Sequence, residues 1–257
     1  MNRVSPARRA LKAALWMVRS ARVCAGRTDA RAFRACRRPG PAETPVEVRV
    51  RGIPEPLLCR PGTSDADVLW DTFGEAYHRP PGPLPPDAAI LDLGANVGYT
   101  AVDFAVRHPR ARIIAVELDA ENAALAERNL APFGERCTVL RAAVWSCDGE
   151  VAYGGDEAWG LRVVPGAAGS RHAPAIRIST LLRRFDIDRV HYVKMDIEGG
   201  EAEVLSDSEW LDRVEAIKIE VHPPATLESC ERTLRAAGFR VGRDRRHDAC
   251  VWGSRRA

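Results

Sequence analysis

The chain has 257 residues, of which 46% are hydrophobic and 28% charged, and its formal net charge is +3. This composition is that of an ordinary globular protein, and no apolar run approaches the ~20 residues that a membrane-spanning helix needs. The seven cysteines are odd in number and never spaced as C-x-x-C, which disfavours a disulfide framework or a zinc site and predicts a reducing, cytoplasmic location.

The first predicted element is a basic helical arm, residues 1–45. Its first 40 residues carry eleven Arg or Lys and a single acid, Asp29. Apolar residues at helical spacing predict one apolar stripe among the arginines: Leu11, Ala14, Leu15 and Val18. Two interpretations stay open. Either the stripe packs on the domain, or the arm contacts an anionic membrane surface, nucleic acid or an acidic partner. The run "ALWMV" is too short for a secretory signal.

A small cap of strands and a helix is expected over residues 46–86. The segments "VEVRVRG" and "PLLCRPG" alternate in hydropathy like two short strands, joined near Gly52 and Pro54. In "DADVLWDTFGEAYH" four apolar residues share one helical face: Val68, Leu69, Phe73 and Tyr77. The proline-rich "RPPGPLPP" then predicts a linker into the main domain.

Residues 87–257 alternate strands and helices, the pattern of a mostly parallel, doubly wound α/β sheet. Strands are expected in "AAILDLG", "ARIIAVELD", "CTVLRAAVW", "VHYVKMDIEG" and "VEAIKIEVH", and a closing pair in "FRVG" and "DACVWG". Helices are expected in "VGYTAVDFAVRH", "AENAALAERNLA" and "TLESCERTLRAAGF". Residues 146–178 are irregular and predict an excursion over the edge where the strands end. Ligands of such folds bind at that edge.

The loop after the first of these strands runs from Gly94 to Gly98 as Gly-Ala-Asn-Val-Gly. A glycine turn between strand and helix lets a ligand approach the backbone, and dinucleotide sites use G-x-G-x-x-G there. Here Asn96 replaces the second glycine, and Asp92 would repel a pyrophosphate. S-adenosylmethionine, which carries an ammonium and a carboxylate, suits the loop better. A glycine turn that serves only strand-to-helix packing is the alternative.

Two later strand ends extend this prediction. Glu117 ends the second strand, where an acid can accept hydrogen bonds from both ribose hydroxyls of a nucleoside. Dehydrogenases place an acid at a similar distance, so Glu117 alone does not separate the two cofactors. The third strand ends in the apolar "AAVW", which predicts an adenine edge near Ala143 and Val144.

The stretches "LDLGANVGYT", "AVELD", "VKMDIEGGE" and "IKIEVH", in this order, resemble the FkbM family of S-adenosylmethionine-dependent methyltransferases. The resemblance runs from about Val46 to near the C-terminus. It implies a Rossmann-like, seven-stranded class I methyltransferase sheet and methyl transfer, most often to a hydroxyl of a small molecule, sugar or secondary metabolite. It also implies that Thr100 belongs to the loop motif and that Tyr77 helps to cover the cofactor.

Loop, strand ends and resemblance together predict the residues that bind S-adenosylmethionine, with S-adenosylhomocysteine as the product. They are Tyr77, Asp92, Gly94, Ala95, Asn96, Gly98, Thr100, Glu117, Leu118, Asp119, Ala143, Val144 and Asp196.

Methyl transfer to a hydroxyl needs a base near the methyl group. His222 at the end of the fifth strand is the first candidate, because an unperturbed imidazole titrates near neutral pH, and Asp196 is the second. His222 could instead only cap a strand end before its two prolines. Lys194 and Glu220 could form a structural ion pair across adjacent strands. A magnesium ion could be gathered by four side chains, although no metal is expected: Asp196, Glu198, Glu220 and His222.

Other functions stay open at this point. The basic arm favours a methyltransferase acting on a macromolecule, but "DIEG" stands where base N-methyltransferases carry an Asn/Asp-Pro-Pro-aromatic motif. A noncatalytic cofactor-binding protein and a pyridine-nucleotide enzyme are further alternatives. The acceptor pocket is expected in residues 56–85 and 150–178, where Trp159 and Arg162 fit no single acceptor chemistry. The oligomeric state is not predicted.

Overall fold

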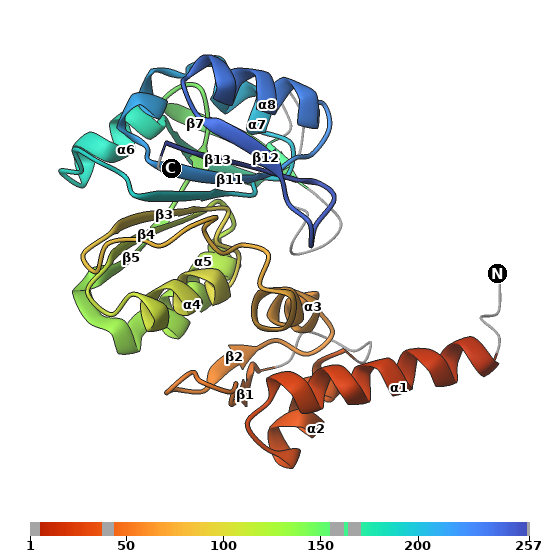
Figure 1. The fold of residues 1–257 in the computed structure, drawn as a ribbon. Helices are drawn as coiled ribbons and strands as arrows, with labels where there is room; N and C mark the ends of the chain where they lie inside the picture. The colour runs from red at the N-terminus through yellow and green to blue at the C-terminus, as the bar shows by residue number, and fades with distance from the viewer. Residues whose placement is uncertain (1–5, 38–43, 155–161, 164–170, 256–257) are drawn as a thin grey trace. The chain divides into compact units, whose positions relative to one another are not determined.

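The structure is a computed structural model that describes residues 6–37, 44–154, 162–163 and 171–255. These residues form two compact units that divide between Ala76 and Tyr77 (Figure 1). No helix in the described part of the chain is long and apolar enough to cross a membrane.

The N-terminal unit is built from helices and one hairpin. Its elements are α1 (Pro6–Val23), α2 (Arg27–Cys36), the antiparallel strands β1 (Val46–Val48) and β2 (Leu57–Cys59), α3 (Asp65–Trp70) and a π-helical turn, η1 (Asp71–Glu75). Trp16 of α1 packs on Phe33 of α2 with ring centroids 5.5 Å apart. The hairpin and the helix predicted for the cap are present. The helix ends in the π-helical turn before Ala76, which has a φ of 55°.

The buried face of α1 differs from the predicted apolar stripe at Ala14, Leu15 and Val18; the side chain of the fourth member, Leu11, lies outside the described residues. Trp16, Ser20 and Val23, spaced by four and three residues, are buried, whereas Leu15 and Val18 are 47% and 67% exposed. Ser20 can be buried because its hydroxyl donates to the carbonyl of Met17 and accepts a hydrogen bond from Arg34. Hydropathy spacing alone selects the most apolar face of a helix, and here a more mixed face is the one that packs.

The C-terminal unit is organised around a seven-stranded sheet, as predicted. The strands across it are β12 (Arg240–Arg243), β13 (Cys250–Ser254), β11 (Ala216–Glu220), β10 (Tyr192–Met195), β3 (Ala89–Leu93), β4 (Arg112–Glu117) and β5 (Cys137–Arg141). From β11 to β5 neighbouring strands are parallel, and β13 runs antiparallel to both of its neighbours. Such a sheet is buried on both faces, which explains strands that are almost continuously apolar.

Helices cover both faces of this sheet (Figure 1). One face carries α4 (Tyr99–Arg107) and α5 (Ala120–Leu130), and the other carries α6 (Ile178–Arg184), α7 (Glu201–Ser206) and α8 (Leu227–Ala236). Two short 3-10 turns, η2 (Ala131–Arg136) and η3 (Glu209–Arg213), complete the unit. Asp119 caps α5 by accepting hydrogen bonds from the backbone N–H groups of Glu121 and Asn122. The class I methyltransferase architecture expected from the sequence is therefore present.

The third predicted strand, "CTVLRAAVW", is in fact two strands in two sheets. The chain leaves the main sheet after Arg141, and Ala143–Val144 forms β6, which pairs with β9 (Arg171–Ile176). With β7 (Gly149–Gly154) and β8 (Arg162–Val163) they make a four-stranded side sheet in the order β6-β9-β7-β8. The predicted excursion is thus a small sheet. Trp159, expected in the acceptor pocket, lies outside the described residues.

All seven cysteines are free thiols. Five are buried, Cys137 is half-buried and Cys147 is exposed. Burial raises the pKa of the Cys24 thiol to about 12, so this residue behaves as a small apolar side chain rather than as a nucleophile.

Candidate active site

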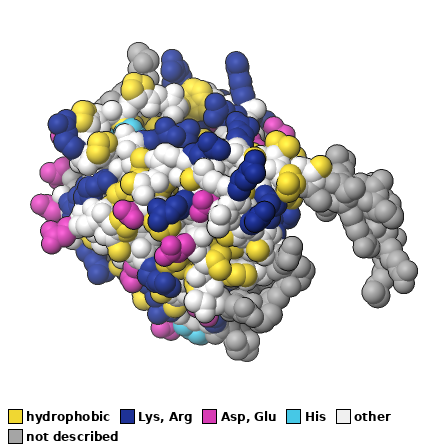
Figure 2. Space-filling model, turned by 90° about the horizontal axis from the view of Figure 1, so that it is seen from below, with side chains coloured by type: hydrophobic (Ala, Val, Ile, Leu, Met, Phe, Trp, Pro, Cys, Tyr) yellow, Lys and Arg dark blue, Asp and Glu magenta, His cyan; other side chains and the backbone are white. Residues whose placement is uncertain are grey.

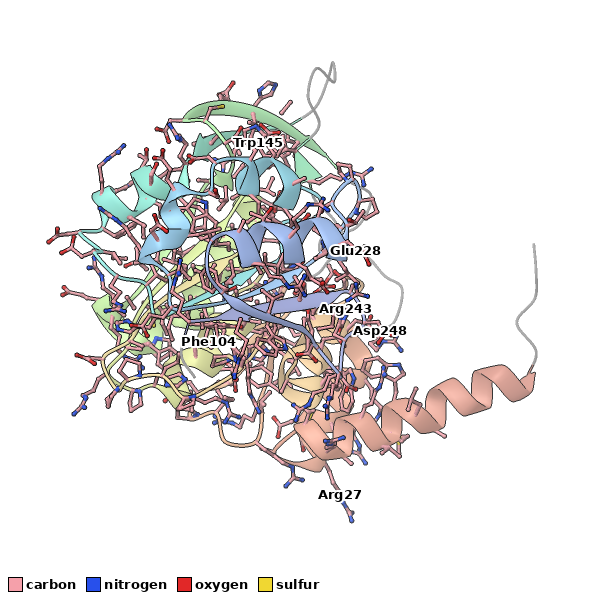
Figure 3. The ribbon with its side chains drawn as sticks, turned by 45° about the horizontal axis from the view of Figure 1, so that its top comes forward. Arg27, Phe104, Trp145, Glu228, Arg243 and Asp248 are labelled. Carbon is pink, nitrogen blue, oxygen red and sulfur yellow. The ribbon has the colours of Figure 1, made fainter. Side chains whose placement is uncertain are left out.

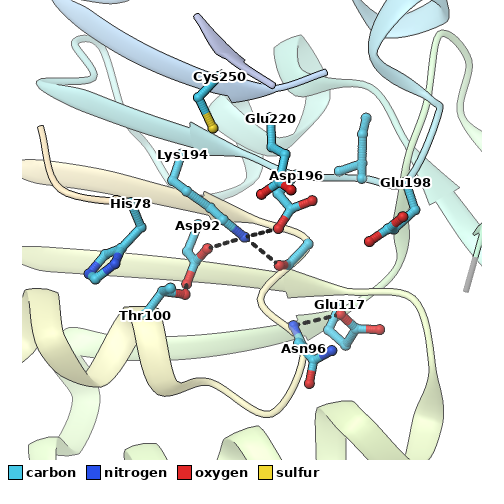
Figure 4. A network of polar contacts seen from close by, with 12 residues as sticks. His78, Asp92, Asn96, Thr100, Glu117, Lys194, Asp196, Glu198, Glu220 and Cys250 are labelled. Carbon is cyan, nitrogen blue, oxygen red and sulfur yellow. Dashed lines mark hydrogen bonds and ion pairs between the residues drawn. The ribbon is translucent and has the colours of Figure 1, made fainter. Parts of the chain in front are cut away.

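The carboxyl ends of β3, β4, β10 and β11 carry most of the polar residues that the sequence singles out. Figure 4 shows this network, in which Lys194 lies between two aspartates and the backbone of the glycine loop. Parallel strands bring residues that are about 100 positions apart in the chain to one edge, because Asp92 of β3 pairs in register with Lys194 of β10.

The glycine loop uses its own amides inside the protein. The N–H groups of Gly94 and Ala95 both donate to the carbonyl of Val116, at 2.9 and 3.0 Å. The N–H of Asn96 donates to Glu117 at 2.8 Å, and the N–H of Val97 donates to the Asn96 side chain at 2.7 Å. These four amides are therefore engaged, and the loop is not a cradle for phosphate. This geometry agrees with the argument against a dinucleotide.

The backbone of the loop also requires glycine at its first position. Gly94 has a φ of +77°, and a Cβ atom there would lie 1.7 Å from the carbonyl oxygen of Asp196. Only a residue without a side chain lets β3 and β10 end so close together. Gly98, with a φ of +85°, similarly faces Ala126 of α5, 3.1 Å from a Cβ atom built on it.

Asp92 is completely buried. Thr100 donates its hydroxyl to Asp92 Oδ2, and Lys194 Nζ lies 3.5 Å from Asp92 Oδ1. Thr100 and Asp92 therefore contact each other beneath the loop. Of the predicted aspartates on these strands, Asp196 is the one that reaches the surface of the edge, with a side chain that is 19% exposed.

Lys194 is the buried cation of the site. Its Nζ donates to the carbonyl of Gly94 at 2.8 Å and lies 3.3 Å from Asp196 Oδ2. Burial alone would lower the pKa of Lys194, but the charges of Asp196 and Asp92 outweigh burial and raise it above its usual value. The alternative of a direct ion pair between Lys194 and Glu220 is not found among the described residues, because Lys194 Nζ lies between Asp92 and Asp196, although the charge of Glu220 also raises the pKa of Lys194. Sequence patterns do not show which way a lysine leans along its strand.

Glu117 is 5% exposed and holds the glycine loop from β4. One carboxylate oxygen accepts from the N–H of Asn96 and the other from the N–H of Asp119, at 2.9 Å. Burial raises the pKa of Glu117 to about 7, although the two backbone hydrogen bonds favour the charged form. Each oxygen retains a second lone pair for another donor.

The other predicted cofactor residues lie around this edge. Ala143 and Val144 are buried in β6, and Leu118 packs against Tyr153 and Ala173 of the side sheet. Asp119 accepts hydrogen bonds from Tyr153 and from Arg171, at 3.3 and 2.7 Å. The side sheet is therefore fastened to the start of α5, a link that the sequence does not predict. Trp145, labelled in Figure 3, follows β6 and lies against Gly200.

His222 is held between carboxylates at the end of β11. Its Nδ1 lies 3.1 Å from Glu201 Oε1, and its Nε2 lies 3.5 Å from Glu198 and 3.8 Å from Glu220. Glu201 is fully buried, and the same Oε1 accepts from the N–H groups of Ile197 and Gly199, both at 3.3 Å. A carboxylate fixed by two backbone donors fixes the imidazole that it contacts. The sequence pattern does not reveal this role of Glu201.

These carboxylates perturb two titrations. Burial alone would lower the pKa of His222, but its hydrogen bond to Glu201 and the charges of Asp196 and Glu198 raise it to about 9. Burial and the charge of Asp196 raise the pKa of Glu198 to about 7. The free protein therefore holds His222 as an imidazolium at neutral pH, in an excess of negative charge.

Glu220 links His222 to a second group of side chains. The hydroxyl of Tyr77 hydrogen-bonds to Glu220, and the Tyr77 ring stacks on His247 with centroids 4.6 Å apart. Lys218 Nζ donates to the carbonyl of Tyr77 at 2.6 Å and to Asp244 at 2.7 Å, which holds Tyr77 at this edge. Asp244 is a site residue that the sequence analysis missed, and Lys218 was assigned no role from the sequence.

Two sets of potential metal ligands occur among the described residues. The ligand atoms of Asp196, Glu198 and His222 lie within 4.8 Å of one another. The same holds for Glu220, His247 and Cys250. The first set includes three of the four side chains considered in the sequence analysis. Carboxylate and imidazole atoms at these separations could bind a divalent cation.

Comparison with known proteins adds three findings. Residues 92–241 match the sequence model of the methyltransferase FkbM domain. The AMB antimetabolite synthetase AmbE of Pseudomonas aeruginosa is 27% identical over 230 residues, a match that covers 71% of this chain and 11% of AmbE. The chain thus spans about a tenth of the length of that relative.

Similar solved structures include TrmK of M. capricolum in complex with S-adenosyl-homocysteine, at 11% identity over 66% of this chain and 62% of that chain, with a TM-score of 0.41. The N-terminal domain of human METTL16 in complex with SAH is 13% identical over 75% of this chain and 70% of that chain, with a TM-score of 0.43. These TM-scores are too low to carry an argument about function.

Proposed function

Since the chain belongs to the family of FkbM methyltransferase domains, we propose that it transfers the methyl group of S-adenosylmethionine to a hydroxyl of a small molecule. The methyltransferase activity and its cofactor follow from the family. The hydroxyl acceptor and the roles of single residues are the proposal. Its main support is the fixed pair of Glu201 and His222 beside Asp196, at the edge where the strands end.

The residues of this edge fit a cationic cofactor. Asp196 Oδ1 is buried and, among the described residues, has no hydrogen-bond partner. Four carboxylates lie at the edge, and the charges of three of them, Asp92, Asp196 and Glu220, act on the buried Lys194; the fourth is Glu198. When bound, S-adenosylmethionine supplies an electrophilic methyl group on a positively charged sulfonium. An excess of buried negative charge favours such a ligand over a pyrophosphate.

Each binding role rests on a contact described above. We assign the ribose hydroxyls to Glu117, whose oxygens keep free lone pairs, and the amino group of the methionine part to Asp196. Asp92 and Thr100 act from beneath, by fixing Lys194 and the start of α4. Tyr77, stacked on His247, covers the edge from the side of β11 and β13.

His222 is the proposed general base. Glu201 accepts the Nδ1 hydrogen, which leaves the lone pair of Nε2, 3.5 Å from Glu198 and 3.8 Å from Glu220, to take a proton in the neutral imidazole. Nε2 takes the proton of the acceptor hydroxyl as the oxygen forms its bond to the methyl carbon. Because the pKa of His222 is about 9 in the free protein, the reactive neutral form is a minority species at pH 7. The rate therefore rises with pH.

The acceptor class is supported by one comparison. AmbE is named as an antimetabolite synthetase, which favours a secondary metabolite as the source of the hydroxyl. A macromolecular acceptor finds no support in this edge, where carboxylates outnumber basic side chains and would repel nucleic acid.

Calorimetric titration with S-adenosylmethionine and with NAD tests the cofactor site. Binding of the first alone, weakened at least tenfold in Asp196→Asn and Glu117→Gln, is expected. Product analysis tests the acceptor. The protein is incubated with carbon-13 methyl-labelled S-adenosylmethionine and a metabolite extract, and carbon NMR distinguishes a methoxy carbon from an N- or S-methyl carbon. An N-methyl product would refute the hydroxyl acceptor.

His222→Ala tests the base once a substrate is known. We expect kcat to fall by roughly 10² to 10⁴ while S-adenosylmethionine still binds. Turnover in EDTA should equal turnover in magnesium, because the proton goes to an imidazole. If EDTA abolishes turnover, the set of Asp196, Glu198 and His222 holds a metal and the base assignment fails.

A further inference from the structure

Helix α1 of the N-terminal unit exposes large apolar side chains. Leu15, Met17 and Val18 are 47%, 55% and 67% exposed. Among the described residues they are the large hydrophobic side chains that are exposed to solvent. Buried Trp16 lies between them in sequence and faces α2. Leu15 and Val18, three residues apart, share a side of the helix that meets solvent, and Met17 lies about 100° around the helix from Val18. An exposed apolar cluster confined to one helix indicates an interaction surface.

The same helix is strongly basic. Between Pro6 and Val23 it contains five Arg or Lys residues and no acid, and the first acid of the chain is Asp29 in α2. The carboxylate of Asp29 accepts a hydrogen bond from the backbone N–H of Arg49 at 3.1 Å. Figure 2 shows hydrophobic and basic side chains next to one another on the right of the face that it draws.

A groove between α1 and α2 continues this surface. It has a volume of about 470 Å³, and its apolar lining includes Met17 and Ala21 of α1 and Ala30 of α2. Arg27, Arg31 and Arg34 also line it, four and three residues apart on α2. Arg27 points away from the ribbon (Figure 3). In the described part of the chain no carboxylate forms a salt bridge with these three arginines. Met17 belongs to both the groove and the exposed cluster.

We propose that this surface binds an anionic lipid bilayer. Leu15, Met17 and Val18 enter the boundary between headgroups and acyl chains. Arg27 and Arg31 contact lipid phosphates, while Arg34 donates to Ser20. Nucleic acid would need only the arginines. An interfacial helix needs exposed aliphatic residues flanked by basic ones, and α1 combines both. A peripheral enzyme held in this way would act on acceptors at or near a membrane surface. The proposal is independent of the acceptor hydroxyl.

The test is sedimentation of the 257-residue chain with vesicles. Vesicles of equal parts phosphatidylcholine and phosphatidylglycerol should bind the protein, and vesicles of phosphatidylcholine alone should not. Binding should weaken with salt. Leu15→Glu with Val18→Glu should abolish it, and Arg27→Ala with Arg31→Ala should weaken it by about fivefold per arginine. Ala120→Glu with Ala124→Glu is the matched control, since it adds two charges to exposed positions of α5.

Thermal unfolding and S-adenosylmethionine binding verify that the variants are folded. Absence of sedimentation with anionic vesicles overturns the proposal. The proposal is also overturned if the double variant Leu15→Glu with Val18→Glu sediments with anionic vesicles as the wild type does. Tight binding of duplex DNA that needs Arg27 and Arg31 but not Leu15 would make this a nucleic-acid surface instead. A concentration-dependent dimer that the double Glu variant dissociates would make the occupant a second copy of the chain. A lower unfolding temperature of that variant, without vesicle binding, would mean that the stripe packs on its own protein.

Discussion

In the proposed mechanism Glu201 acts on the chemistry only through His222, which makes it a positioning residue that can be tested. Its Oε1 accepts from two backbone N–H groups and from His222, so a glutamine oxygen at the same place can keep all three contacts. Glu201→Gln therefore removes a charge and preserves the geometry. We expect the rising limb of kcat/KM against pH to move about one unit lower, because less negative charge stabilises the imidazolium.

The matched control is Glu203→Gln on the exposed side of α7, which should leave the pH profile in place. Glu201→Ala should lower the plateau of kcat as well, because the imidazole loses its anchor. If the limb stays at the same pH in Glu201→Gln, the group that titrates is not His222.

At this scale the sequence identified many residues of the edge but not their contacts. Asp92, Glu117, Asp196 and His222 are predictable because each ends a strand beside a recognisable loop. Lys194 and Lys218 are not, since strand register decides that their side chains reach Asp92 and Tyr77. The assignments of these residues to S-adenosylmethionine stay predictions.

Gly94 allows the loop after β3 to lie close to the end of β10. In Gly94→Ala the new Cβ would meet the carbonyl of Asp196 at 1.7 Å, and a φ of +77° disfavours alanine as well. The loop must shift, and Asn96 and Lys194 lose their partners with it. We expect a loss of at least 2 kcal/mol in unfolding free energy and at least tenfold weaker binding of S-adenosylmethionine.

Gly82→Ala is the control, because no heavy atom lies within 4 Å of a Cβ atom built on Gly82. It should match the wild type in denaturant unfolding and in calorimetry. Equal behaviour of the two alanine variants would show that the loop tolerates a side chain and that its glycine serves no close approach.

Elements with strong local signals were predicted well. Strands β3, β4 and β11 are apolar runs, and α4 stops at Arg107, just before Pro109. The helices α6 and α7 were missed because they are seven and six residues long, too short for a clear helical period. The split between β5 and β6 was missed because one apolar run serves two sheets. Local sequence does not show where a strand changes partners.

Three groups at the strand edge should lower the stability of the cofactor-free protein as the pH rises, whereas His78 and His108, whose pKa values burial lowers, act in the opposite direction below about pH 6.5. Glu117 and Glu198 have pKa values raised from 4.5 to about 7, and that of His222 is raised from 6.5 to about 9. A group whose pKa is higher in the folded than in the unfolded protein stabilises the fold fully at pH values below its unfolded pKa. This stabilisation is lost as the pH rises through its folded pKa. All three effects therefore act between pH 4.5 and 9.

The expected result is a thermal midpoint about 5 °C lower at pH 9 than at pH 5, measured by calorimetry. Glu117→Gln should reduce this difference, because glutamine has no proton to lose. If the thermal midpoint stays constant or rises between pH 5 and pH 9, the pKa values of these carboxyl groups are not raised in the folded protein.

The strand order has a consequence for how the chain folds. Strand β3 pairs on one side with β4, about 23 residues later, but on the other with β10, about 100 residues later. While a ribosome makes the protein, β3, β4 and β5 can assemble early, yet the other edge of β3 stays open until residues near 195 emerge. That edge exposes unpaired backbone next to Ile90, Leu91 and Leu93, which is the kind of surface that aggregates. Non-local pairing of this kind makes folding slow, so a chaperone that shields β3 should increase the yield of native protein.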